Sequence, residues 1–177
     1  KGVKAAVVMA AGFAEIGEEG ANLEKEVADI ARQGGIRLLG PNCNGFFNTQ
    51  ANIFSTFTIY SAQRGGIGFI SQSGNLGTVI IQCGIRTGLG FSKFISTGNE
   101  ADLHFEDFVD YLGQDKETRV IIGYVEGLRE GRRFLALARE ISKTKPIVLL
   151  KVGETTGGTR AAYSHTRALA GDKEVCD

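Results

Sequence analysis

Three groups of residues have the types that phosphoryl transfer to a histidine needs. Ser73-Gly74-Asn75 lies where an apolar strand turns into a helix, so unpaired backbone N–H groups and the positive end of the helix dipole would attract an anion. Glu126 ends an uncharged strand, where a carboxylate can orient an imidazole and stabilise its cationic form for attack on a phosphoryl group. His165 lies near a Gly- and Thr-rich segment that can position a side chain through turns.

Each of these residues also has an ordinary structural interpretation. A serine before a glycine at a helix start is common for capping alone, and Glu126 fits equally a surface glutamate in a turn. His165 alone is compatible with either kind of role. The only other histidine, His104, follows Asp102 at a predicted helix start, so we interpret it as a surface or capping residue.

Two familiar nucleotide motifs are missing. The run Gly153–Gly158 lacks the lysine and the strand-to-helix context of a phosphate loop,. Gly84, Gly88 and Gly90 do not have the spacing of a dinucleotide fingerprint,. Neither motif supports a nucleotide site in this sequence.

Composition restricts the class of partner. Lys plus Arg and Asp plus Glu both number 20 among 177 residues, and no basic stripe is present, which argues against nucleic acid. No apolar run is long enough to span a bilayer. Cys43, Cys83 and Cys176 lack the spacing of a zinc site or a disulfide framework,. We therefore expect a cytoplasmic protein with small-molecule or protein partners, no metal site and no membrane contact.

Short apolar strands alternate with amphipathic helices, and this alternation predicts an α/β fold with parallel, doubly wound sheets. The stretch 42–64 shows no helical period and is rich in polar residues, so we expect a long loop or a crossing between domains. A first domain is predicted for residues 1–62 and a second for residues 63–177. The predicted strands are 5–9, 36–39, 67–70, 91–95, 120–125 and 147–150, and the helices are 21–33, 74–86, 105–112 and 132–142.

Ligands of open parallel sheets bind outside the carboxyl ends of the strands. The residues directly after the predicted strands are therefore the candidates for a binding site, and the tail from Val152 to His165 can reach the same edge. These candidates are Ala10–Gly12, Asn42-Cys43, Ser71–Gly74, Ser96–Asn99 and Glu126-Gly127.

Several long motifs, in this order, resemble the acyl-CoA synthetases that form nucleoside diphosphates, together with the α subunit of succinyl-CoA synthetase. The first two motifs resemble the second half of that family's Rossmann-like CoA-binding domain, and the others resemble its flavodoxin-like ligase domain. The motifs are Gly12–Gly20, Gly40–Gly45, Gly68–Gly77, Ser96–Asp102 and Ser164–Thr166.

The resemblance implies a reaction in which a carboxylic acid, CoA and ATP are interconverted with acyl-CoA, ADP and phosphate, through an acyl phosphate and a phosphohistidine. By this resemblance His165 carries the phosphoryl group, Glu126 orients and stabilises it, and Ser73, Gly74 and Asn75 hold the phosphate. It also implies that CoA and the acyl group lie against Ala10, Gly12, Asn42, Cys43, Gly98 and Asn99.

Two departures from the family pattern bear on activity. Arg167 stands where the family commonly has a glycine after Ser-His-Thr. The first half of the CoA-binding domain and the ATP-grasp part are not in this sequence, so we expect a fragment that is inactive alone. CoA is then a substrate, while ATP, ADP and Mg²⁺ are bound by a partner ATP-grasp subunit or domain in an oligomer.

Two other functions remain open from the sequence. The chain is also compatible with a non-catalytic module that binds or senses acyl-CoA, with Arg167 marking a degenerate phosphorylation loop. It is compatible as well with the synthetase-like part of a protein acetyltransferase, although the presence of Glu126 and His165 counts against that alternative.

Overall fold

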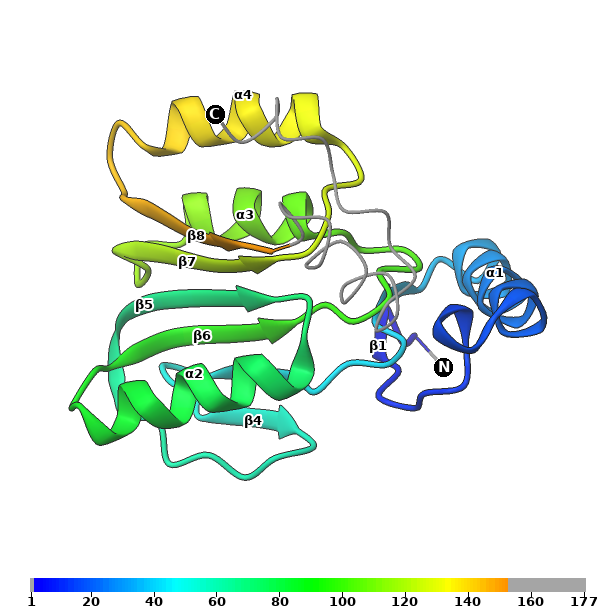
Figure 1. The fold of residues 1–177 in the computed structure, drawn as a ribbon, viewed down its shortest axis with the longest axis horizontal. Helices are drawn as coiled ribbons and strands as arrows, with labels where there is room; N and C mark the ends of the chain where they lie inside the picture. The colour runs from blue at the N-terminus through cyan, green and yellow to red at the C-terminus, as the bar shows by residue number, and fades with distance from the viewer. Residues whose placement is uncertain (1, 153–177) are drawn as a thin grey trace.

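The computed structural model describes residues 2–152, which form a small two-stranded unit beside a six-stranded sheet (Figure 1). In the small unit, strands β1 (Ala5–Val7) and β2 (Arg37–Leu39) pair in parallel. The short 3-10 helix η1 (Ala14–Ile16) and helix α1 (Glu18–Gln33) connect the two strands. The predicted β-α-β unit is therefore present. His165, Arg167 and the Gly- and Thr-rich segment that begins at residue 153 lie outside the described residues.

The large sheet has the strand order β4-β3-β6-β5-β7-β8. Strands β6, β5, β7 and β8 are parallel to one another. At one edge, β3 and β4 form an antiparallel hairpin, and β3 pairs antiparallel with β6. The strands are β3 (Gly45–Asn48), β4 (Ile53–Thr56), β5 (Arg64–Ser71), β6 (Phe91–Ser96), β7 (Val120–Val125) and β8 (Ile147–Lys151).

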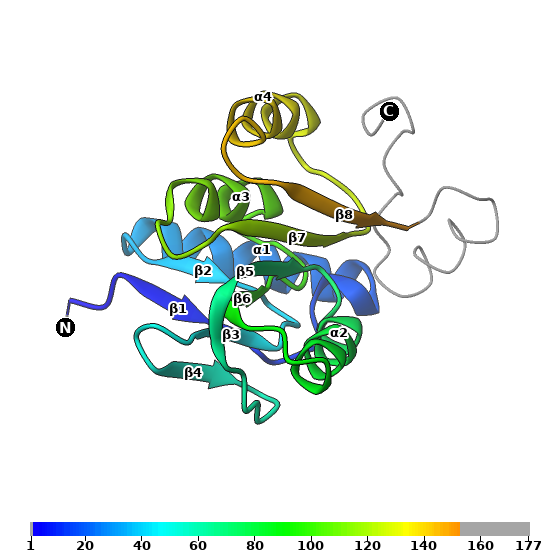
Figure 2. The same ribbon diagram turned by 90° about the vertical axis from the view of Figure 1, so that its left-hand side faces the viewer.

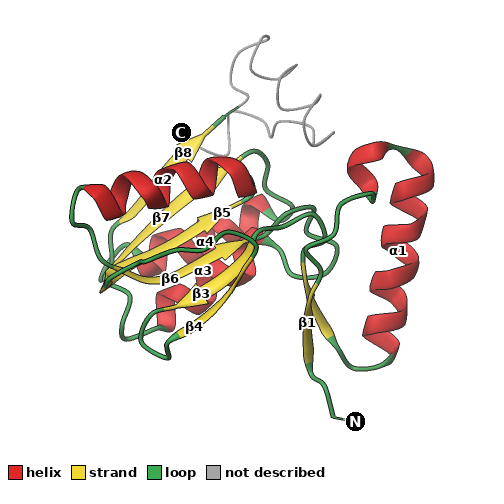
Figure 3. Cartoon of the chain, turned by 90° about the horizontal axis from the view of Figure 1, so that it is seen from below, coloured by secondary structure: helices red, strands yellow, loops and turns green. Residues whose placement is uncertain are grey.

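Helices cover both faces of this sheet. Helix α2 (Gly74–Arg86) lies on one face, and α3 (Phe105–Gln114) and α4 (Gly131–Ile141) lie on the other (Figures 2 and 3). All six residues of β6 are buried, as expected for a strand covered on both sides. The predicted α/β fold with a mostly parallel sheet is confirmed. Within residues 2–152 no helix has the length and apolar character that crossing a membrane requires.

One structural expectation is wrong. The stretch 42–64 is not a long loop, because β3 and β4 lie within it, and β3 joins the large sheet by pairing with β6. Phe47 of β3 is fully buried, and its ring lies 5.5 Å from that of Phe94 in β6. Contacts with a distant strand stabilise the hairpin, and a local pattern does not reveal such contacts. The boundary between residues 62 and 63 stays a prediction.

The small unit is fixed to the carboxyl edge of the large sheet. The Asp102 carboxylate accepts hydrogen bonds from the Arg37 guanidinium (2.9 Å) and the Leu38 amide (2.8 Å). Gly98 has a φ of +63°, and a Cβ there would lie 2.1 Å from the carbonyl oxygen of Pro41. Only glycine allows this approach, which brings the segment after β2 against the segment after β6.

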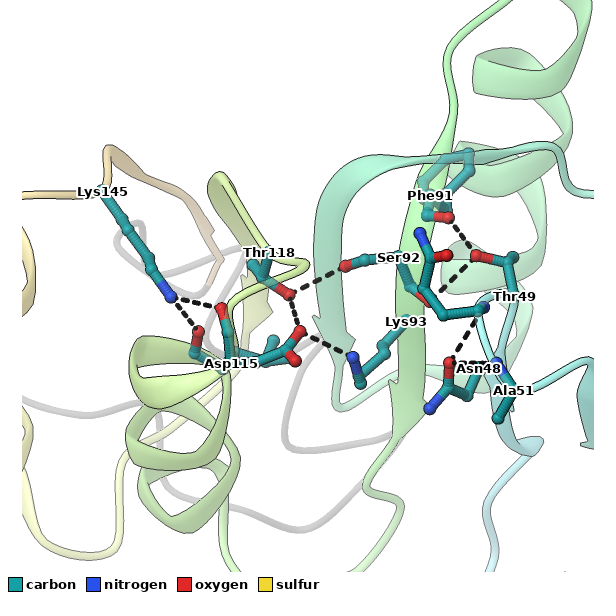
Figure 4. A network of polar contacts seen from close by, with 11 residues as sticks. Asn48, Thr49, Ala51, Phe91, Ser92, Lys93, Asp115, Thr118 and Lys145 are labelled. Atoms are coloured by element: carbon teal, nitrogen blue, oxygen red, sulfur yellow. Dashed lines mark hydrogen bonds and ion pairs between the residues drawn. The ribbon is translucent and has the colours of Figure 1, made fainter.

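The opposite, amino edge of the sheet contains a buried polar cluster (Figure 4). Lys93 of β6 forms an ion pair with Asp115 at 2.6 Å, and Asp115 also accepts a hydrogen bond from Thr118. Ser92 and Thr118 share a further hydrogen bond of 2.8 Å. Lys145 donates to the carbonyl oxygen of Asp115. We call this set the amino-edge cluster.

Candidate functional site

A cavity of about 240 Å³ opens at the carboxyl edge of the large sheet, where the small unit meets it. Loops after β2, β5 and β6 form most of its wall, together with the start of α2 and the segment after β4. The lining residues are Met9, Asn42, Cys43, Asn44, Phe57, Thr58, Gln72, Ser73, Gly74, Asn75, Gly98 and Asn99.

The cavity brings together most of the site residues predicted from the sequence, namely Asn42, Cys43, Ser73, Gly74, Asn75, Gly98 and Asn99. Ala10 and Gly12 are not among the lining residues. The carbonyl oxygen of Ala10 accepts a hydrogen bond from the Asn42 amide at 2.9 Å, and the Gly12 amide donates to the Glu15 carboxylate. Ala10 is therefore hydrogen-bonded directly to the wall, whereas Gly12 is linked to it through Glu15 and Asn99.

The start of α2 presents backbone amides to the cavity. Ser73 is the N-cap, and its hydroxyl accepts a hydrogen bond from the Leu76 amide at 3.3 Å. The capping interpretation of Ser73 is thus confirmed. The first backbone N–H groups of the helix have no intrahelical partners. A Cβ on Gly74 would lie 3.3 Å from the Asn44 Cβ, so the backbone approaches the opposite wall closely. This geometry suits an anion.

Asn99 connects the cavity to the small unit. Its side-chain amide donates to the carboxylates of Glu15 (2.6 Å) and Glu24 (2.8 Å) and accepts from the Asn42 amide group (3.1 Å). Burial alone would raise the pKa of Glu15, but the hydrogen bonds from Asn99 and Gly12 outweigh it and hold that pKa below its usual value. Glu15 is therefore ionised at neutral pH and fixes the orientation of the Asn99 amide.

Asn44 was not selected from the sequence, although it lies in the Gly40–Gly45 motif. Its side-chain amide donates to the hydroxyls of Tyr60 (2.8 Å) and Thr78 (2.8 Å), and its carbonyl oxygen accepts from the Thr58 amide (3.1 Å). These contacts hold the segment after β4 over the cavity. Phe57 of the same segment lines the cavity while 83 % exposed.

Glu126 directly follows β7 and is only 5 % exposed. The interpretation of Glu126 as a surface residue is therefore wrong. Burial raises the pKa of Tyr124, and the charge of Glu126 and its hydrogen bond with the Tyr124 hydroxyl raise it further. The backbone amide of Glu126 donates to Oε1 of Gln72 at 2.5 Å, and Gln72 lines the cavity. Glu126 thus lies at the same sheet edge as the start of α2.

Glu100 is a second buried carboxylate at this edge, with an exposed fraction of 4 % and a φ of 60°. Its Oε1 accepts hydrogen bonds from Thr97 (2.8 Å) and Gln72 (3.0 Å). Burial raises its pKa to about 7 despite these hydrogen bonds, and the nearby charge of Glu106 raises it too. No local pattern in the sequence indicates a buried carboxylate at position 100, because the burial arises from packing between distant segments.

His104 and Cys43 are two further residues that the sequence analysis interpreted. His104 precedes α3 as its N-cap, and its backbone amide donates to the Asp107 carboxylate at 2.9 Å, which confirms the capping interpretation. Burial raises the pKa of the Cys43 thiol, so this side chain lines the cavity as a neutral group. No group of three or more His, Cys, Asp or Glu side chains within residues 2–152 could hold a metal ion.

Comparisons with known proteins show the family of this chain. The family described as "Succinyl-CoA ligase like flavodoxin domain" matches residues 64–177. The α subunit of ADP-forming acetate–CoA ligase II from Pyrococcus furiosus is 49 % identical over 99 % of this chain and 38 % of its own length. ADP-forming acetate–CoA ligase I from Archaeoglobus fulgidus is 44 % identical over 99 % of this chain and 26 % of its own length.

A solved structure is similar in both fold and sequence. It is the dinucleotide forming acetyl-coenzyme A synthetase 1 of Ca. Korarchaeum cryptofilum in complex with phosphate and ADP, with a TM-score of 0.93 and 40 % identity. The match covers 99 % of this chain and 38 % of that one. The chain therefore spans well under half the length of each of these relatives.

Proposed function

The chain belongs to the family of succinyl-CoA ligase like flavodoxin domains, and from this premise we propose that the whole protein is an NDP-forming acyl-CoA ligase. Such an enzyme interconverts a carboxylic acid, CoA and ATP with acyl-CoA, ADP and phosphate. Relatives that match almost the whole chain are named as ADP-forming acetate–CoA ligases. Acetate is accordingly the first acid to test.

The observation that carries this proposal is the shared sheet edge of the α2 start and Glu126. Transfer of a phosphoryl group needs a site for the anion and a group that orients the carrier. The amides at Ser73, Gly74 and Asn75 supply the first, and the buried carboxylate of Glu126 supplies the second. The similar Korarchaeum synthetase was solved with phosphate and ADP bound, which supports a phosphate role for the same fold.

The proposed reaction has three steps. A ring nitrogen of His165 forms a bond to the γ-phosphorus of ATP, and the bond to the leaving ADP oxygen breaks. An oxygen of the carboxylic acid then takes the phosphoryl group, which forms an acyl phosphate and releases the imidazole. Finally the CoA sulfur attacks the acyl carbon, and inorganic phosphate leaves.

The remaining site residues have roles in this scheme that follow from their positions. Asn42, Cys43, Gly98 and Asn99 lie on the wall of the cavity and would contact the acyl group and the thiol end of CoA, with Ala10 and Gly12 beside them. The raised pKa of Cys43 supports a lining role, because a neutral thiol is a poor nucleophile. ATP, ADP and Mg²⁺ would be bound by an ATP-grasp subunit or domain, in agreement with a relative named as an α subunit.

Phosphorylation of the full-length protein with its ATP-grasp region tests this function. After incubation with ATP and Mg²⁺, we expect acid-labile phosphate on the peptide that contains His165, and none in His165→Ala. His104→Ala is the matched control, since His104 caps α3, and it should be phosphorylated like the wild type. Undiminished phosphate in His165→Ala would contradict the proposal, and lack of phosphate in the wild type would favour the non-catalytic acyl-CoA-binding alternatives.

A further inference from the structure

Gln72 connects the ends of three strands through one side-chain amide. Its Oε1 accepts hydrogen bonds from the backbone amides of Glu126 (2.5 Å) and Gly127 (3.0 Å). Its Nε2 donates to the carbonyl oxygen of Gly127 (2.7 Å) and to Oε1 of Glu100 (3.0 Å). A side-chain amide has two donor and two acceptor positions, so every hydrogen-bonding position of Gln72 is in use.

These partners determine the orientation of the Gln72 side-chain amide. Oε1 faces two N–H donors, and Nε2 faces two oxygen acceptors, so a flipped amide would place like groups against each other at every contact. Three of the four hydrogen bonds go to the backbone of Glu126 and Gly127. Gln72 therefore holds the turn that immediately follows β7, and with it the Cα of Glu126.

Glu100 and Thr97 hold Gln72 in turn. Oε1 of Glu100 accepts from Gln72 and from the Thr97 hydroxyl. Glu100 keeps a φ of 60°, a conformation that non-glycine residues rarely adopt and that tends to persist at functional sites. A series of hydrogen bonds thus connects Thr97 and Glu100 after β6 with Gln72 after β5, and Gln72 with Glu126 after β7.

We propose that Gln72 is a positioning residue of the phosphorylation site, which holds the Glu126–Gly127 turn in the geometry that phosphoryl transfer to His165 requires, and that Glu100 supports it. This inference rests on the proposed function of Glu126 and His165. It assigns Gln72 a role through the backbone of Glu126, in addition to its place on the cavity wall. The consequence is a defect in the phosphoryl-transfer rate with little change in CoA affinity.

Substitutions that exchange donors and acceptors separate this role from simple packing. Gln72→Glu keeps the shape and the acceptor for the two backbone amides, but it places an oxygen against Glu100 and the Gly127 carbonyl. In the double variant Gln72→Glu/Glu100→Gln, the side chain at position 100 can donate a hydrogen bond to the carboxylate at position 72. The contact is thus restored with donor and acceptor exchanged. A purely steric role for Gln72 would not distinguish these two variants.

The experiment uses the full-length protein with its ATP-grasp region and measures the single-turnover rate of phosphohistidine formation from ATP. A displacement of about 1 Å near a reacting group can cost on the order of 10²-fold in rate, so we expect losses of that order in Gln72→Ala and Gln72→Glu. The double variant Gln72→Glu/Glu100→Gln should recover part of this loss, at least about threefold over Gln72→Glu. The dissociation constant of CoA should stay within about twofold throughout.

The matched control is Gln82→Ala, which removes an exposed glutamine from helix α2 and should leave the rate unchanged. Wild-type rates in both Gln72 variants, with a large loss in Glu126→Gln, would overturn the positioning role and leave the proposed function intact. A double variant no faster than Gln72→Glu would also overturn it. Phosphate retained in His165→Ala would overturn both proposals together.

Discussion

The two edges of the large sheet contain buried polar groups that are satisfied in different ways. In the amino-edge cluster, Lys93 and Asp115 form an ion pair at 2.6 Å with side-chain exposures of 6 % and 14 %. Burial alone would raise the pKa of Asp115, but hydrogen bonds from Lys93 and Thr118 and the charge of Lys93 lower it. Opposite charges compensate each other here, as expected for a structural cluster.

At the carboxyl edge, two buried carboxylates are not compensated in this manner. Within residues 2–152, neither Glu100 nor Glu106 forms an ion pair, and Oε2 of Glu106 is buried with no hydrogen-bond partner. Burial raises the pKa of Glu100 to about 7. Buried carboxylates with a raised pKa beside a cavity are typical of functional sites. We therefore assign a structural role to the amino-edge cluster and propose that the chemistry takes place at the carboxyl edge.

The largest expected effect is a loss of activity at the carboxyl edge. In Glu126→Gln, the buried site keeps its shape but loses the charge that stabilises a cationic imidazole, so the rate of phosphohistidine formation should fall on the order of 10³-fold. Single-turnover phosphorylation of the full-length protein measures it. Glu140→Gln, at an exposed position on α4, should match the wild type. Equal rates in Glu126→Gln and Glu140→Gln would contradict a catalytic role of the carboxyl edge.

The second effect is a loss of stability at the amino edge. Lys93→Met leaves the Asp115 carboxylate without its partner in a largely buried position, which should cost about 3 kcal/mol of unfolding free energy. Chemical denaturation measures this change, and phosphohistidine formation by the folded variant should be unaffected. Lys143→Met removes a surface ion pair of side chains that are 66 % and 76 % exposed and should change stability little. A similar small effect of both variants would contradict a structural role of the amino-edge cluster.

The third effect is a pH dependence of stability that comes from Glu100. Its pKa is about 7 in the folded protein, against 4.5 for a glutamate exposed to water. Between these values the unfolded chain has released the proton and the folded chain still holds it, so stability falls as pH rises, by about 1 kcal/mol per pH unit. Wild type should therefore lose stability relative to Glu100→Gln between about pH 5 and 7, as followed by thermal unfolding. Parallel curves would show that Glu100 titrates normally.

The smallest expected effect concerns the acid substrate. Phe57 is the exposed apolar wall of the cavity, and Phe57→Ala would enlarge that side while the polar floor stays in place. The ratio of kcat/KM for a longer or branched acid to that for acetate should rise about tenfold. Ile59→Ala is the matched control, because Ile59 is 93 % exposed and does not line the cavity. An equal shift in both variants would exclude Phe57 as a determinant of acid size.

The parallel strands and their helices could be predicted because their signals are local. Strands covered on both faces are rich in apolar residues, and the serine at position 73 before Gly74 marks the start of α2,. The candidate residues after these strands followed from topology alone, and most of them line one cavity. The residues directly after a parallel strand can therefore be selected from the sequence, whereas the contacts among them cannot.

The hairpin and the Gln72 contacts could not be predicted for the same physical reason. Strands β3 and β4 have four residues each, and β3 depends on pairing with β6, whose Phe94 is the partner of Phe47 and lies 47 residues further along the chain. Gln72 reaches Glu126 only because three strand ends meet. Likewise, the raised pKa of Glu100 comes from burial, which no local pattern encodes.

The most direct measurement is a chase of the isolated phosphoprotein. Full-length protein phosphorylated on His165 is separated from nucleotide and then mixed with acetate and CoA. We predict that phosphate leaves the protein and that about one equivalent of acetyl-CoA forms per phosphohistidine, since the acid accepts the phosphoryl group before CoA attacks the acyl carbon. Phosphate that stays on His165, or acetyl-CoA formation at the wild-type rate by His165→Ala, would contradict a phosphohistidine relay in this protein.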